Sequence, residues 1–223
     1  MSLMKSSLNL AALKISAQQF STELTSTSIS SLYGVTDGKA VGSYVEKAFV
    51  EYVSKRFDFQ AGNSAQGLDF PKLSVDIKVT SIRQPQSSCP FISADQKVYG
   101  LGYHLLVFVY EKTDIASDKV AKLEIKHVIF IDKLYTGDFQ TTKGICELLD
   151  SGANADDLDA FIEERNLPLD YIGRRNLATR LMADRPRIGW LTISNALQWR
   201  LQYTRAIEKA SSEELEGVEN LSG

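Results

Sequence analysis

Cysteine and histidine are scarce in this chain of 223 residues, which contains two of each. Cys89 and Cys146 cannot complete a four-ligand zinc site, and together with His104 and His127 they do not assemble a zinc finger or a histidine-metal nuclease site. The shortage of histidine also argues against histidine-based catalytic triads. Any catalysis therefore has to be carried by other side chains.

Long apolar runs and nucleotide-binding glycine motifs are absent as well. No run of eighteen apolar residues occurs, and the first residues lack the apolar block of a signal peptide, so we expect a soluble, cytoplasmic protein. The sequence has neither a Walker motif, which cradles phosphates, nor the glycine fingerprint of dinucleotide-binding domains. These absences argue against a membrane-spanning protein, an ATPase and a dinucleotide-dependent enzyme.

The composition is that of a globular protein with unevenly distributed charge. With 43% hydrophobic residues, the chain is long enough for one domain with a substantial core and a smaller helical addition. The net charge is only −3, but residues 150–164 are acidic whereas arginines crowd residues 174–205. We interpret the arginine-rich stretch as a candidate nucleic-acid-binding surface.

The most informative segment is residues 67–80, with the sequence GLDFPKLSVDIKVT. Because side chains on a strand alternate between its two faces, Asp76 and Lys78 share one face and the apolar residues beside them take the other. A tight turn through residues 71–74 would fold Asp69 back beside Asp76. The sequence therefore predicts two neighbouring carboxylates next to a lysine.

Two carboxylates so placed are suitable ligands for Mg²⁺, and a nearby ammonium can orient the attacking water or stabilise charge on phosphorus. Asp69, Asp76 and Lys78 resemble the motif of the PD-(D/E)XK nuclease superfamily, which is an acid, a spacer, and then an acid, any residue and a lysine. Leu68 stands where the family has proline, and the spacer of six residues is short. The resemblance implies that Asp69, Asp76 and Ile77 bind the metal and that Lys78 is catalytic.

An amphipathic helix is predicted immediately before this motif. Residues 38–53 place Val41, Val45 and Phe49 at helical spacing, and Glu46 falls at the border of the apolar stripe. Many superfamily members carry a glutamate on the helix before the catalytic strands, so the resemblance implies that Glu46 is a further metal or water ligand. The alternative is an ordinary surface glutamate.

The segments that follow predict the remainder of a catalytic core. Residues 93–101 are expected to form a short helix, residues 104–110 a buried strand, and residues 123–131 the second arm of a hairpin. We therefore expect an α/β fold: a central mixed sheet of about five strands flanked by helices, as in restriction endonucleases, with a C-terminal helical region. The predicted segments are an N-terminal Ser/Thr-rich part with a helix at 8–24 (1–35), the catalytic core (36–135), a helical DNA-binding region with helices at 155–165, 171–183 and 192–210 (136–210), and an acidic tail (211–223).

A second set of residues repeats the same spacing. Asp118, Glu124 and Lys126 also form an acid, six residues, and then acid-x-lysine. We prefer the first set, because it lies between a helix bearing a glutamate and a helix followed by a buried strand. The second set is expected on an outer strand, where its charges would be solvated.

Two parts of the sequence are candidates for DNA recognition. The polar stretch at 80–90 leaves the catalytic strand, and glutamine and arginine can pair with adenine and guanine respectively. The second part is the arginine-rich stretch at 174–205. The alternatives are that the polar stretch is a flexible surface loop and that the arginines only solvate helix faces. The residues that we expect to contact DNA are Arg83, Gln84, Gln86, Gln96, Lys97, Arg174, Arg175, Asn195 and Arg200.

The preferred interpretation is a Mg²⁺-dependent enzyme similar to type II restriction endonucleases. It would cut both strands of DNA at a specific site, leave 5′-phosphates, and act as a homodimer on a palindrome, with the N-terminal segment as a candidate dimer contact. A DNA methyltransferase of the same system is a candidate partner. The alternatives are a structure-specific repair or junction nuclease, a non-catalytic DNA-binding protein, and an α/β interaction module without a nucleic-acid role.

Overall fold

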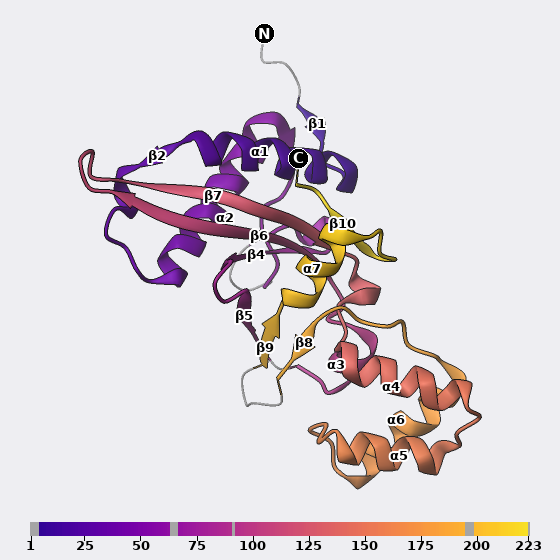
Figure 1. Ribbon diagram of the computed structural model, residues 1–223. Helices are drawn as coiled ribbons and strands as arrows, with labels where there is room; N and C mark the ends of the chain where they lie inside the picture. Colours follow the sequence, from indigo (N-terminus) through magenta and orange to yellow (C-terminus); the bar gives the residue numbers. More distant parts are fainter. Residues whose placement is uncertain (1–4, 63–66, 91, 195–198, 223) are drawn as a thin grey trace. The chain divides into compact units, whose positions relative to one another are not determined.

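A computed structural model describes residues 5–62, 67–90, 92–194 and 199–222 of the chain. The chain divides into two compact units, each assembled from separate stretches of sequence (Figure 1). Unit 1 comprises residues Met1–Pro85, His104–Ile131 and Lys209–Gly223, and unit 2 comprises Gln86–Tyr103 and Asp132–Glu208.

Unit 1 is an α/β unit built on a mixed sheet of five strands. The order of the main path is β10-β7-β6-β4, and β2 also pairs with β7. Strand β4 runs parallel to β6, whereas the other pairs are antiparallel. The expected central mixed sheet flanked by helices is therefore confirmed. The elements of this unit are β1 (Ser6–Ser7), α1 (Leu10–Ser26), β2 (Ser28–Ile29), η1 (Ser30–Leu32), α2 (Gly38–Arg56), β3 (Phe57–Asp58), η2 (Pro71–Leu73), β4 (Val75–Ser81), β6 (His104–Ile115), β7 (Val120–Ile131) and β10 (Val218–Asn220).

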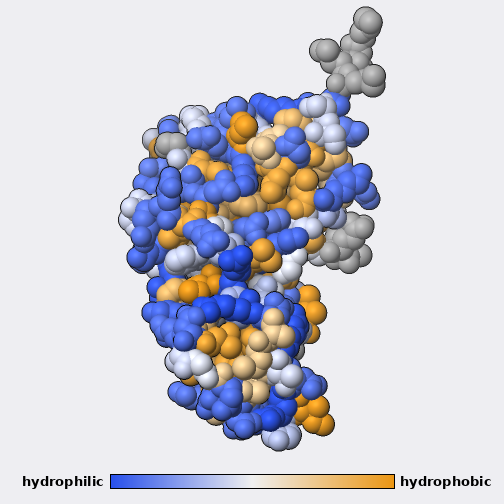
Figure 2. All heavy atoms as spheres, turned by 90° about the vertical axis from the view of Figure 1, so that its right-hand side faces the viewer, coloured by the Kyte–Doolittle hydropathy of each residue, from blue (hydrophilic) through white to orange (hydrophobic). Residues whose placement is uncertain are grey.

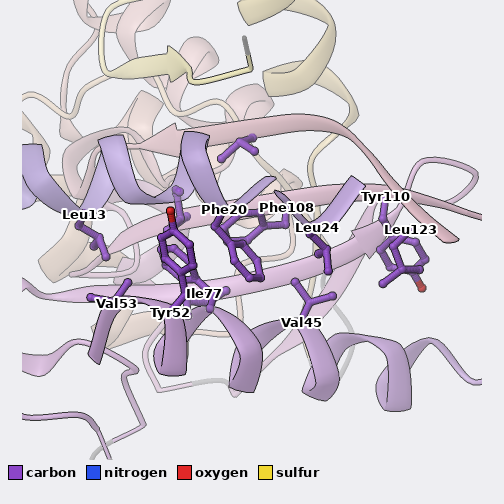
Figure 3. Packing of buried hydrophobic residues seen from close by; sticks show 14 of the residues in the cluster. Leu13, Phe20, Leu24, Val45, Tyr52, Val53, Ile77, Phe108, Tyr110 and Leu123 are labelled. Carbon is purple, nitrogen blue, oxygen red and sulfur yellow. The ribbon is translucent and has the colours of Figure 1, made fainter. Parts of the chain in front are cut away.

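The core of unit 1 lies between one face of the sheet and helices α1 and α2. Phe20 of α1, Phe49 of α2 and Phe108 of β6 meet there, with ring centroids 5.1–5.8 Å apart. Figure 3 shows side chains from both helices directed toward those of the sheet. Helix α2 approaches closely at Gly42, where an added Cβ would lie 3.8 Å from Cβ of Val79 in β4. This packing fixes α2 against the strand that carries Asp76.

The two ends of the chain differ from the predicted segments. Helix α1 confirms the expected N-terminal helix, but its inner residues Leu13, Phe20 and Leu24 are buried in the core of unit 1. The expected acidic tail is wrong in part, because residues Val218–Asn220 form β10 and pair with Ile129–Ile131 of β7. Val218 is buried in that strand, while the neighbouring glutamates face outward. An apolar residue inside an acidic stretch was the signal for this strand.

The β6–β7 hairpin is longer than predicted, because both strands continue into the polar connection and meet at the pair Ile115 and Val120. The sequence suggested that β7 is an outer strand, and this expectation is wrong. On the side opposite β6, β2 pairs at Ala121 and Lys122 and β10 pairs at the other end. These long-range pairings could not be read from local periodicity.

Unit 2 contains a helical cluster and a small antiparallel sheet. Helices α4, α5 and α6 pack through apolar residues that include Ile145, Leu158 and Leu177. The predicted helices at 155–165 and 171–183 are confirmed, whereas α4, which Asp138 caps, was not predicted. The elements are β5 (Gln86–Cys89), α3 (Asp95–Tyr99), η3 (Lys133–Tyr135), α4 (Phe139–Asp150), α5 (Ala155–Glu164), α6 (Tyr171–Ala183), β8 (Thr192–Ile193) and β9 (Trp199–Gln202); α7 (Thr204–Ser212) follows and continues into unit 1.

The predicted helix at residues 192–210 is wrong over its first half. Thr192–Ile193 and Trp199–Gln202 are strands, and the helix begins only at Thr204. Residues 199–202 alternate buried and exposed, which is the period of a strand, so the sequence WRLQ carried a signal that we misassigned. The expected polar loop at 80–90 is likewise partly wrong, because its second half is β5, which pairs with β9.

The surface mixes polar and apolar residues. Figure 2 shows hydrophobic side chains in patches between hydrophilic ones on one face of the molecule. Roughly 55–60% of a folded protein's surface is normally apolar, so such patches do not by themselves identify an interface. No helix in the described part of the chain is long and apolar enough to cross a membrane.

Candidate active site

A tight turn places Asp69 beside the first residues of β4, as the sequence predicted. The backbone amides of Phe70 and Val75 each donate to the carbonyl oxygen of the other, at 3.0 and 3.2 Å. Ser74 closes the turn in the left-handed region, with a φ of 53°. The Asp69 carboxylate then accepts a hydrogen bond from the backbone N–H of Ile77, with 2.7 Å between Ile77 N and Asp69 Oδ2. This bond holds Asp69 against β4.

Gly62 supports the segment that carries Asp69. Its N–H donates to the carbonyl oxygen of Asp69 at 2.9 Å, and an added Cβ would lie 1.7 Å from the carbonyl oxygen of Leu68. Only glycine therefore fits at this close approach of two backbones. Gly62 was not predicted as part of the site, because nothing in its local sequence points to this contact.

Asp76 and Lys78 lie on the same face of β4, as their alternation predicted. Lys78 Nζ is 2.5 Å from Asp76 Oδ2, and the Asp76 side chain is largely buried. Burial raises the pKa of Asp76 to about 6 and outweighs the Lys78 ammonium, which lowers it; the charge of Asp69 and a hydrogen bond between the two carboxyl groups raise it further. The two carboxylates are thus neighbours.

Glu46 belongs to the same electrostatic site. It is half-buried on α2, and its pKa is raised, first by burial and then by the negative charge of Asp69, while Lys78 lowers it. Helix α2 therefore contributes an acid that is close enough to interact electrostatically with Asp69 and Lys78. This is the position that the apolar stripe of α2 predicted for Glu46.

The donor set at β4 suits a hard divalent cation. Because the Ile77 N–H points to Asp69 and away from β6, the carbonyl of Ile77 faces the same side of the strand as the Asp69 carboxylate. The Asp76 carboxyl group is hydrogen-bonded to that of Asp69. Over the residues that the structure describes, no three histidine, cysteine or acidic side chains converge as a metal cluster. Two carboxylates completed by substrate phosphates are the way in which proteins usually bind Mg²⁺, so the residues present fit that ion.

Loss of the Asp76 proton should make the metal-free protein less stable as the pH rises. The folded chain holds this proton with a pKa of about 6, against an ordinary value of 3.8, so between pH 4 and pH 6 the folded state binds more protons than the unfolded state. The free energy of unfolding contributed by this group therefore falls over that window. Urea denaturation in EDTA at pH 4.5 and 7.5 should show that Asp76→Asn gains more stability over the wild type at the higher pH. An equal difference at both pH values would contradict this.

The second acid-x-lysine set is an ordinary surface network. Lys126 contacts Glu124 at 2.7 Å and Glu111 at 3.3 Å across the hairpin, and the Glu124 side chain is 56% exposed. Asp118 lies in the hairpin turn before β7. The preference for the set on β4 therefore agrees with the burial of Asp76 and the exposure of Glu124.

The predicted DNA contacts from the end of β4 to α3 have different surroundings. Arg83 and Gln84 are exposed in the turn after β4, whereas Gln86 begins β5. Gln96 and Lys97 are buried in α3; the Gln96 amide donates to the carbonyl oxygen of Leu101 and accepts from the N–H of Ile92. Burial lowers the pKa of Lys97 against the opposing charge of Asp138. Gln96 and Lys97 thus have structural partners within unit 2.

Most arginines of the basic stretch are paired with acids of unit 2. Arg174 contacts Asp159 at 3.4 Å and Glu163 at 3.0 Å, and Arg175 forms an ion pair with Asp156. Arg180 pairs with Asp95, and Arg185 pairs with Asp150 through both guanidinium nitrogens. The acidic stretch at 150–164 thus neutralises much of the charge that we assigned to DNA binding. Arg200 is exposed on β9, and Asn195 lies outside the described residues.

The mixed five-stranded sheet, with Asp76 and Lys78 on β4 and Asp69 in the segment before it, is compatible with the fold class of restriction endonucleases. Residues 7–220 match the family model described as "Type II restriction enzyme NspV", and the chain belongs to that family. The type II restriction enzyme NspV of Nostoc sp. (strain ATCC 29411 / PCC 7524) is 56% identical over 183 residues, which cover 82% of this chain and 83% of that protein. No solved structure matches the chain. The enzyme class is therefore that of a restriction endonuclease.

Proposed function

We propose that this restriction endonuclease requires Mg²⁺ and hydrolyses both strands of DNA at a specific site to leave 5′-phosphates. The observation that carries the proposal is the hydrogen-bonded acid pair Asp69 and Asp76, with Lys78 beside it. Family membership supports site-specific cleavage over the junction-nuclease and non-catalytic alternatives. The metal and the products are inferred from the chemistry of the donor set.

In this proposal the carboxylates of Asp69 and Asp76 and the carbonyl of Ile77 hold Mg²⁺. When bound there, Mg²⁺ would supply positive charge to neutralise the scissile phosphodiester and would acidify the attacking water. Glu46 is the further acid of the site and orients solvent on the side of α2. Each residue has an oxygen donor that suits a hard cation.

Lys78 positions the attacking water and stabilises the negative charge that develops on the scissile phosphate. Its ammonium is held by Asp76 at 2.5 Å, and with the side chain 20% exposed it can reach a bound phosphate. Water oxygen forms the new bond to phosphorus and the bond from phosphorus to the 3′ oxygen breaks. The water gives up a proton and the 3′ oxygen gains one. The products are a 3′-hydroxyl and a 5′-phosphate.

Cleavage should need Mg²⁺ and give discrete fragments. Incubation of the purified protein with phage and supercoiled plasmid DNA is expected to yield a fixed band pattern with Mg²⁺ and intact DNA in EDTA. The reason is that the two carboxylates and the phosphate are all negatively charged, so the cation is needed to bring them together. Ligation of the fragments before and after phosphatase treatment checks for 5′-phosphates. A smear without discrete bands would argue against site specificity, and cutting in EDTA would argue against the metal.

The proposed oligomeric state follows from the need to cut both strands of the DNA. A symmetric homodimer on a palindrome is the simplest way to cut both strands with one active site per chain. A DNA methyltransferase of the same system would protect the host's sites. Sedimentation of the protein with and without a cleavable duplex tests the dimer, and a monomer in both cases would exclude it.

A further inference from the structure

The small sheet of unit 2 has one polar and one buried face. Strands β5, β9 and β8 are adjacent and antiparallel, and the register pairs Gln86 with Gln202 and Ser88 with Arg200 across β5 and β9. On the other side of β9, Thr192 pairs with Gln202. Because paired residues of antiparallel strands share a face, these five side chains form one array, which we call the polar face.

The opposite face fixes the orientation of this array. Trp199, Leu201 and Tyr203 of the same segment are buried, together with their neighbours Cys89 and Ile193. Ser87 and Tyr203 are also joined by a hydrogen bond of 2.5 Å between their hydroxyl oxygens. A slip of one residue would turn the tryptophan and leucine outward, so the register is strongly specified. The polar face is therefore presented on a rigid support.

The chemistry of the polar face matches the edges of DNA bases. Arg200, Gln202 and Ser88 are exposed, while Gln86 and Thr192 are half-buried. Arginine can bond guanine bidentately, glutamine can bond adenine in the same way, and hydroxyl groups bond either base. Strands β5, β8 and β9 contain no aspartate or glutamate, although the chain has 28 acidic residues. No carboxylate on these strands would repel a phosphate.

The spacing of the array also fits duplex DNA. Residues two apart on a strand are about 6.8 Å apart, which is about twice the rise of one base pair. Arg200 and Gln202 are related in this way on β9, and the major groove admits a two-stranded ribbon such as β5–β9. The two side chains can therefore address different base pairs.

We propose that the polar face of the β5–β9–β8 sheet reads bases of the recognition sequence, with Arg200 and Gln202 as specificity-determining residues. This assignment rests on the proposed function, since it supplies the sequence readout for site-specific cleavage. Gln86 and Arg200 were both expected from the sequence to contact DNA, and although they lie far apart in the chain they belong to this one face. The strand register adds Ser88, Thr192 and Gln202 to them.

The test uses full-length wild-type protein and the variants Arg200→Ala, Gln202→Ala and Arg200→Lys, with Gln18→Ala as a matched control. Gln18 is an exposed glutamine on α1. Each protein cleaves a library of duplexes with a randomised centre, and sequencing of the cleaved ends gives the base preference at every position. Thermal melting confirms that each variant is folded.

Each alanine variant is expected to lose about 10- to 100-fold discrimination at its own base-pair position and to keep the preference elsewhere. Arg200→Lys should also relax its position, because lysine lacks the bidentate fork. An unchanged preference, or an equal loss over all sequences as from a phosphate contact, would overturn the assignment. A wild-type protein that cuts no sequence would overturn the proposed function and this assignment with it.

Discussion

Replacing Asp76 with asparagine is expected to reduce Mg²⁺-dependent cleavage at least about 1,000-fold. A bound cation stabilises the transition state by several kcal/mol, and each 1.36 kcal/mol corresponds to a factor of ten in rate. Asparagine has nearly the same shape but no negative charge, so it removes one of the two charges that hold the ion. Single-turnover cleavage of a plasmid, followed over a range of Mg²⁺ concentrations, measures the loss.

Glu124→Gln is the matched control for this substitution. Glu124 also precedes a lysine by two residues on a strand of the same sheet, but it is exposed and lies in a surface network. Its removal should change the cleavage rate by less than a factor of two. If Glu124→Gln abolished cleavage and Asp76→Asn did not, the catalytic site would lie on β7.

The Asp76 variant also separates loss of activity from loss of structure. Because burial raises the pKa of Asp76, its charged form is costly in the folded metal-free protein at neutral pH. Asp76→Asn should therefore be inactive and at least as stable as the wild type. Such an opposition between stability and activity is expected of a charged site built for a ligand.

Replacing Phe108 with alanine is expected to lower the free energy of unfolding by about 3–5 kcal/mol. Phe108 is fully buried in β6, and its ring packs edge-on against Phe20 of α1 and Phe49 of α2. The truncation leaves a cavity where both helices meet the sheet. Urea denaturation monitored by circular dichroism measures the change.

Ile15→Ala on the outer side of α1 is the control for the core substitution. The Ile15 residue is 55% exposed, so its truncation should change stability by less than about 1 kcal/mol. A similar loss for both variants would mean that the aromatic cluster does not dominate the packing of α1. A loss below about 1 kcal/mol for Phe108→Ala would contradict the described core directly.

The geometry of the proposed catalytic segment could be predicted because its determinants are local. Alternation along residues 75–81 fixed the face shared by Asp76 and Lys78, and the turn before β4 fixed the return of Asp69. The position of Glu46 followed from the apolar stripe of α2. Gly62 could not be predicted, because its role depends on a close approach of two backbones whose geometry no local pattern encodes.

The surroundings of the residues predicted or proposed to contact DNA were harder to predict because they depend on distant partners. The charge of Arg174 and Arg175 suggested DNA contacts, yet residues of α5 neutralise both, and only tertiary structure shows this pairing. Strand β9 is four residues long and finds its partner β5 more than a hundred positions earlier in the chain. Short strands of this kind are specified by pairing more than by propensity.

Strand β10 has a consequence for the synthesis of this enzyme. It pairs with Ile129–Ile131 of β7 only after residues 132–217, which include the whole second part of unit 2, have been translated. At about 5–20 residues per second, the ribosome leaves that apolar strand edge uncovered for seconds. Unpaired edges of this kind attract other chains. Nascent chains crowded on one messenger are therefore most prone to aggregate in this interval, and slower initiation or lower temperature should raise the soluble yield.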